Sequence, residues 1–134
     1  MNDMHLNPLA IVAAAVLAFL IGAVWYSPLL FAKRWQQETR LSDAQLKSGS
    51  MARIFGLALV CDLVMSANLA AFLGGKATVS FGLAAGAATG IGWVAMCFAV
   101  NDLFERRPLA LWLINSGYHV ISLTLMGGLL AWWK

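Results

Sequence analysis

The sequence has 134 residues, of which 61% are hydrophobic and only 11% are charged, with a formal net charge of +3. A soluble domain carries about 25% charged residues, so this composition argues against a soluble enzyme or binding domain. The basic residues cluster in short segments, which is a membrane-topology signal and not a nucleic-acid-binding surface. Cys61 and Cys97 lie inside apolar runs and form no C-x-x-C pattern, so no disulfide scaffold is expected.

Four apolar stretches are long enough to cross a bilayer, which takes about 20 residues. They predict an all-α integral membrane protein, a small helical bundle of four transmembrane helices within a single domain, residues 1–134. In chain order, the helices are expected at about 8–32, 53–73, 79–101 and 109–133.

The first predicted helix begins after Asn7, a suitable N-cap, and ends in the motif Trp25-Tyr26-Ser27-Pro28. Pro28 has no backbone N–H and clashes with the preceding turn, so a kink is expected there. Trp25 and Tyr26 are typical of an aromatic belt at the membrane surface. The alternative is that the kink turns one of these rings into a cavity.

Residues 33–52 form the only sizeable predicted loop, in which Ser42-Asp43-Ala44-Gln45 matches a capping box that opens a short helix. Seven of the nine basic residues lie in this loop, at Arg53 or in the turn 102–108. The remaining two are Lys76 and Lys134. The positive-inside rule therefore predicts that loops 33–52 and 102–108 are cytoplasmic and that both termini are outside.

The second helix carries an acid, Asp62, near its middle. A carboxylate at that depth costs at least ~2.5–3.5 kcal/mol on insertion scales, so it needs a partner or a function. Ala58, Asp62, Ser66 and Ala70 recur every four residues and share one face. Small residues on that face predict a contact between helices.

The third helix contains Gly82, Gly86 and Gly90 in consecutive G-x-x-x-G spacing. Such a ladder allows the close approach of another helix, either within the monomer or between subunits. We expect the protein to be a homo-oligomer that associates through this ladder.

The fourth helix is the most polar of the four. Asn115, His119 and Ser122 are spaced by four and three residues and so share a face, and Tyr118 lies beside them. At 1.5 Å per residue, Asp62 and His119 lie about 14 and 15 Å from the membrane boundary. A pair between these two residues that shares a proton is therefore predicted, in a cavity that opens toward the cytoplasm.

The motif Trp25-Tyr26-Ser27-Pro28 resembles that of a family of bacterial membrane proteins known as domain of unknown function 1761. The resemblance extends to the basic aromatic step at Lys33 and Trp35, to Asp62, and to the polar fourth helix around His119. It implies four membrane helices and a bacterial inner-membrane location, and it implies no mechanism.

The leading functional hypothesis is proton-linked transport or permeation of a small solute or ion. The candidate ligand- or proton-binding residues are Asp62, His119, Asn115, Trp25, Tyr26, Ser66, Tyr118 and Ser122. The alternative is a non-catalytic membrane module that binds lipid or another membrane protein. A membrane-embedded enzyme ranks third, because nucleophile, metal-ligand and cofactor motifs are not recognisable; no metal or cofactor is predicted.

Overall fold

The computed structural model describes residues 6–133, which form helices and connecting turns without a strand in that range. Four helices are long and apolar enough to cross a membrane, as predicted. They are α1 (Pro8–Trp25), α4 (Met51–Leu73), the composite helix α5–η1–α6 (Val79–Glu105) and α7 (Leu109–Trp132). The fold class is therefore confirmed as an all-α membrane protein.

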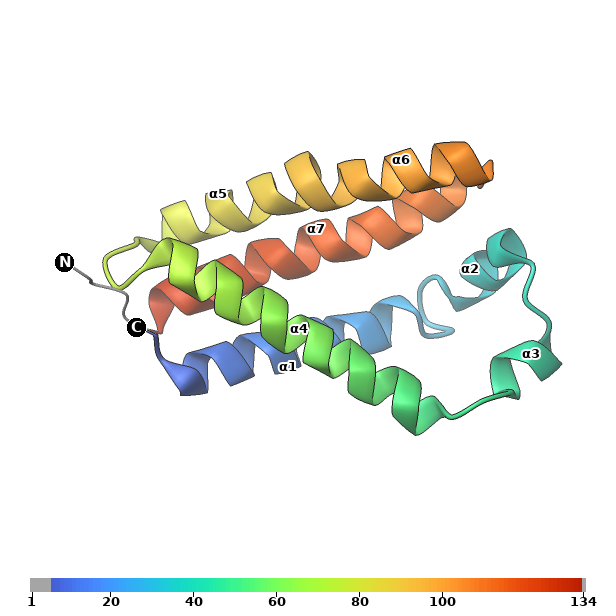
Figure 1. Cartoon of the computed structure of the whole chain (residues 1–134), viewed down its shortest axis with the longest axis horizontal. Coiled ribbons are helices and arrows are strands. Elements are labelled where there is room, and N and C mark those ends of the chain that lie inside the picture. Colours follow the sequence, from blue (N-terminus) through green and yellow to red (C-terminus); the bar gives the residue numbers. More distant parts are fainter. Residues whose placement is uncertain (1–5, 134) are drawn as a thin grey trace.

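Helix α7 is the centre of the arrangement, because it contacts every other membrane-crossing helix. Along one side of α7 runs the composite helix, while α1 packs on another side and α4 crosses α1 diagonally (Figure 1). The start of α1 and the end of α7 lie at one end of the bundle. The two short helices α2 (Ala32–Thr39) and α3 (Asp43–Lys47) lie at the opposite end (Figure 1).

The first helix ends at Trp25, whereas the sequence predicts that it continues, with a kink, to about residue 32. The Ser27 hydroxyl donates a 2.6 Å hydrogen bond to the carbonyl oxygen of Val24, and the backbone N–H of Phe31 bonds the carbonyl oxygen of Trp25. These bonds close a turn around Pro28, which has no N–H of its own to continue the helix. Helix α2 begins directly after this turn, at Ala32, and the rest of it lies in the region predicted as loop.

The predicted capping box is confirmed at α3. The Ser42 hydroxyl accepts a 3.1 Å hydrogen bond from the backbone N–H of Gln45, and the Gln45 side chain accepts a 2.8 Å bond from the backbone N–H of Ser42. Two N-terminal N–H groups are thereby satisfied reciprocally.

The glycine ladder faces α7 of the same chain. An added Cβ would overlap the carbonyl oxygen of Gly127 if it were placed at Gly82, and that of Leu123 if it were placed at Gly86. At Gly90 the same atom would lie 2.8 Å from the Cα of Val120. The prediction that this ladder joins two copies is therefore wrong, because α7 occupies the face that only glycine leaves open. Self-association itself stays a prediction.

The composite helix contains a π-helical turn, η1 (Gly90–Val94), between α5 (Val79–Thr89) and α6 (Ala95–Glu105). Helix α6 ends at Glu105, four residues after the predicted boundary. Asp102, predicted in a polar turn, consequently lies on this helix and is buried, with 8% of its surface exposed.

Candidate functional site

Asp62 marks the point at which α4 becomes buried. Every residue from Met51 to Cys61 is exposed or half-buried, whereas Asp62 is only 5% exposed. One turn further, the Ser66 hydroxyl donates a 2.8 Å hydrogen bond to the carbonyl oxygen of Ile11 in α1. The predicted face of small and polar residues is thus buried from Asp62 onward, and Ala58 is exposed.

No hydrogen bond or ion pair to Asp62 is formed by any residue in the range 6–133. The Tyr118 hydroxyl is directed to α1, where it donates a 2.9 Å bond to the carbonyl oxygen of Ala18. The ring fits against Gly22, since a Cβ there would lie 3.2 Å from it. Asp62 is thus a buried carboxyl without a donor, and the Tyr118 hydroxyl already has an acceptor in α1.

His119 faces a different helix. Its ring stacks on Phe98 of α6 with the ring centroids 5.3 Å apart, and its Nδ1 atom is buried without a hydrogen-bond partner among the described residues. Neither a hydrogen bond nor an ion pair joins Asp62 to His119, so the predicted pair is not formed. Depth along a helix does not determine the direction in which a side chain points. Tyr118 and His119 are consecutive on a helix with 3.6 residues per turn, so their side chains point about 100° apart.

The aromatic residues at the end of α1 bind α7, and their predicted place in an aromatic belt at the membrane surface stays a prediction. The Trp25 indole N–H donates a 2.8 Å hydrogen bond to the carbonyl oxygen of Ile114, and the Tyr26 hydroxyl donates a 2.8 Å bond to Oδ1 of Asn115. Burial raises the pKa of Tyr26 well above its usual range, and the neighbouring Tyr118 adds to that effect. The phenol therefore stays neutral and can donate a hydrogen bond to Asn115.

Two further predicted site residues form hydrogen bonds to backbone. Ser66 binds α1 as described above, and the Ser122 hydroxyl donates a 3.4 Å bond to the carbonyl oxygen of His119 within α7. Such hydrogen bonds between or along membrane helices contribute about 0.6 kcal/mol on average. Among the eight predicted site residues, Asp62 forms no side-chain hydrogen bond within residues 6–133, and the buried Nδ1 atom of His119 has no partner there either.

Sequence reasoning missed a polar strip of α7 that faces the π-helical turn. The Trp112 indole N–H donates a 2.9 Å hydrogen bond to the carbonyl oxygen of Ala95, directly after η1. Ser116, one turn further and 3% exposed, has a buried hydroxyl with no partner among the described residues. The i, i+4 spacing of Trp112 and Ser116 was a signal that could have found this strip.

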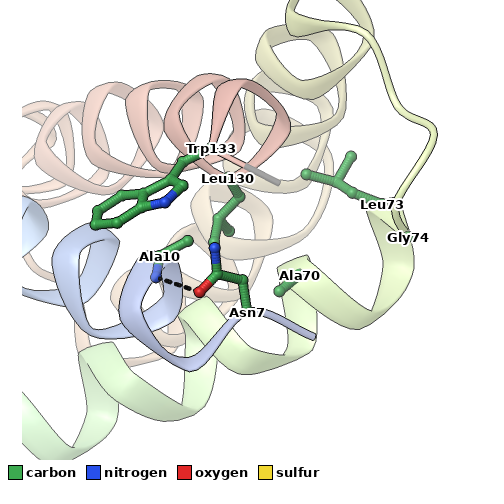
Figure 2. Close-up of a pocket in the computed structure, with 7 residues that line it drawn as sticks. All are labelled: Asn7, Ala10, Ala70, Leu73, Gly74, Leu130 and Trp133. Atoms are coloured by element: carbon green, nitrogen blue, oxygen red, sulfur yellow. Dashed lines mark hydrogen bonds between the residues drawn. The ribbon is translucent and has the colours of Figure 1, made fainter. Parts of the chain in front are cut away.

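A small cavity lies where the ends of α1, α4 and α7 meet (Figure 2). Its volume of about 10 Å³ is close to the room needed for one water molecule. Asn7 lines it and caps α1, since its Oδ1 accepts a 3.1 Å hydrogen bond from the backbone N–H of Leu9. This cavity is far along the bundle from Asp62 and belongs to the packing of the helix ends.

The family model described as Protein of unknown function (DUF1761) matches residues 9–131, which is nearly the whole chain. The resemblance drawn from Trp25–Pro28 and the acid in α4 is thus confirmed. Searches of the curated proteins and of the solved structures gave no match.

Proposed function

This chain belongs to the family described as Protein of unknown function (DUF1761), and we propose that it moves a small solute or ion across a membrane in a proton-linked manner. Asp62 is the group that binds the proton. The family description names no activity, so the proposal rests on the residues of this chain.

The observation that carries the proposal is the free carboxyl of Asp62 in the middle of α4. Its polar neighbours Ser66 and Tyr118 each donate to a backbone carbonyl, and neither donates to Asp62. An unpaired carboxylate is costly in the low dielectric of a membrane interior. Binding of a proton or of a small cation removes that cost, which makes Asp62 suited to reversible binding.

Access to Asp62 is expected from the end of the bundle that carries α2 and α3. The half of α4 between this end and Asp62 is exposed or half-buried throughout, so the protein itself leaves this route uncovered. His119 supplies a second free polar group on the neighbouring side of α7, and its ring centroid is 4.7 Å from that of Tyr118.

Location and assembly are part of the same proposal. The family resemblance favours a bacterial inner membrane. The basic asymmetry favours an orientation with the α2–α3 end in the cytoplasm and both termini outside. We expect a homo-oligomer, because four helices leave little room for a solute pathway within one copy.

Proton flux in proteoliposomes tests the function. The purified protein is reconstituted into liposomes that enclose a pH-sensitive dye. A pH gradient that drives protons outward is imposed, with charge compensation so that no membrane potential builds up. Pooled amino acids, sugars and inorganic ions are supplied outside. We expect wild-type protein to collapse the gradient faster than empty liposomes. Asp62→Asn should abolish that increment, and Asp62→Glu should keep part of it, because it retains a carboxyl.

Asp102→Asn is the matched control, because Asp102 is also buried but lies at the end of α6. It should leave the flux unchanged. If Asp62→Asn, at equal protein incorporation, carried the same proton flux as the wild type, the role of Asp62 would be refuted. If the wild-type protein collapsed the gradient no faster than empty liposomes do, transport itself would be refuted.

A further inference from the structure

A surface hollow of about 430 Å³ lies along α2 and the turn that leads to α3. It is far larger than the cavity between the helix ends, and it lies in the segment richest in basic residues. Its lining residues are Lys33, Gln36, Gln37, Arg40, Leu41 and Ser42.

The two cations of this lining carry charge that no carboxylate of the described chain neutralises. Glu38 forms an ion pair with Arg34, which donates a 2.8 Å hydrogen bond to it. Oδ1 of Asp43 accepts a 2.8 Å hydrogen bond from the Gln36 side chain. Both acids of the segment therefore have other partners. Lys33 and Arg40 are exposed and form no ion pair within residues 6–133.

The backbone of the turn at Arg40 has a defined conformation that a side-chain hydrogen bond stabilises. Arg40 ends α2 in the left-handed conformation, with φ 60° and ψ 29°. That conformation costs a residue with a Cβ about 1–2 kcal/mol, so glycine would be the less strained choice. The Gln36 amide bridges the turn by donating a 3.1 Å bond to the carbonyl oxygen of Leu41. The guanidinium is therefore presented from a preformed backbone.

The hollow is placed at the membrane boundary. Helix α1 ends at Trp25, and the Trp35 ring of α2 lies edge-on to that of Tyr26 with the ring centroids 6.0 Å apart. In the connecting turn, Leu29 is 85% exposed and Leu30 is 51% exposed. This exposed apolar pair directly precedes, in sequence, the segment that forms the cationic hollow, and the combination matches the two parts of a phospholipid.

We propose that this hollow binds the phosphate-bearing headgroup of an anionic phospholipid. Arg40 and Lys33 contact the phosphate oxygens, for which guanidinium and ammonium groups are the usual protein ligands. Leu29 and Leu30 lie against the upper acyl chain. The inference goes beyond the transport proposal and does not depend on Asp62.

Native mass spectrometry of the detergent-purified protein tests this site. Equal amounts of phosphatidylglycerol and phosphatidylcholine are added in competition, and the bound lipids are counted. We expect phosphatidylglycerol to be retained in preference. Lys33→Gln and Arg40→Gly should each weaken its binding about five-fold, as expected for the loss of one interfacial charge. Arg40→Gly also relieves the backbone strain, so its melting temperature should not fall.

Lys47→Gln is the matched control, because it removes the same charge from the same segment but does not line the hollow. It should bind phosphatidylglycerol as the wild type does. An equal loss in Lys47→Gln would mean that a diffuse basic field attracts the lipid, and the site would be refuted. The absence of a preference over phosphatidylcholine would also overturn it. Displacement of the lipid by an equal concentration of inorganic phosphate would indicate a free-anion site instead.

Discussion

The Tyr26 hydroxyl donates a 2.8 Å hydrogen bond to Oδ1 of Asn115 and thereby ties the end of α1 to α7. Trp25 makes a parallel connection, since its indole binds the carbonyl oxygen of Ile114. These two hydrogen bonds hold the end of α1 in place, where the chain leaves the helix just before Pro28. They fix the edge of the bundle that α2 covers.

The stability of the variant Tyr26→Phe, measured as a function of pH, should report on both the hydrogen bond and the raised pKa of Tyr26. At neutral pH the variant should be less stable by about 1 kcal/mol, because Asn115 loses its donor. A tyrosine whose pKa is raised by folding stabilises the protein below the pKa of the unfolded chain, about 10, and this contribution is lost as the pH rises further. The stability gap between wild type and Tyr26→Phe should therefore narrow above about pH 10.

Thermal unfolding in detergent across the alkaline range measures this gap. Tyr118 is present in both proteins, so the part of its ionisation that is independent of Tyr26 cancels in the comparison. Parallel melting curves with a constant gap would contradict the raised pKa of Tyr26.

Close backbone contact between α5 and α7 should make Gly86 intolerant of even one methyl group. In Gly86→Ala the Cβ would collide with the carbonyl of Leu123 and would lie 2.8 Å from the Cα of Thr124. Backbone cannot swing aside as a flexible side chain can, so the helices must separate. The free energy of unfolding should fall by about 1–3 kcal/mol, as it does when a core is overpacked.

Gly56→Ala is the control, since nothing lies within 4 Å of a Cβ at that position in α4. It should leave the melting temperature unchanged or raise it, because alanine is the better helix former. Equal melting temperatures for Gly86→Ala and wild type would show that α5 and α7 are not packed through the ladder.

How much of this could be predicted from sequence differs between the fold and the site. Long apolar runs predict the four membrane helices, and the Ser42–Gln45 pattern predicts the start of α3; both signals are local. The direction in which each helix faces is not local. A membrane helix is apolar on all sides, so no amphipathic stripe tells which face meets which neighbour.

The glycine ladder and Asp62 illustrate this limit. The spacing of Gly82, Gly86 and Gly90 indicates that a helix packs there, but it does not distinguish α7 of the same chain from a second copy. Likewise, the predicted depth puts Asp62 and His119 at one level, and only the rotation of α7 shows that His119 faces Phe98 of α6.

The side of the membrane on which α2 and α3 lie can be tested by cysteine labelling. In a background without Cys61 and Cys97, an impermeant maleimide applied to intact cells should label Lys76→Cys and not Gly49→Cys. Both positions are exposed, whereas Ala77 is buried and unsuitable as a probe. The reverse labelling pattern would invert the topology.

The claim that Asp62 exchanges a proton with water is tested most directly by infrared difference spectroscopy of the reconstituted protein between acidic and alkaline buffer. A protonated carboxyl has a carbonyl stretch in a region free of amide bands. We predict a reversible band of this kind in the wild type that is missing in Asp62→Asn and retained in Asp102→Asn. A wild-type difference spectrum that is unchanged by Asp62→Asn would contradict a proton-binding role for Asp62.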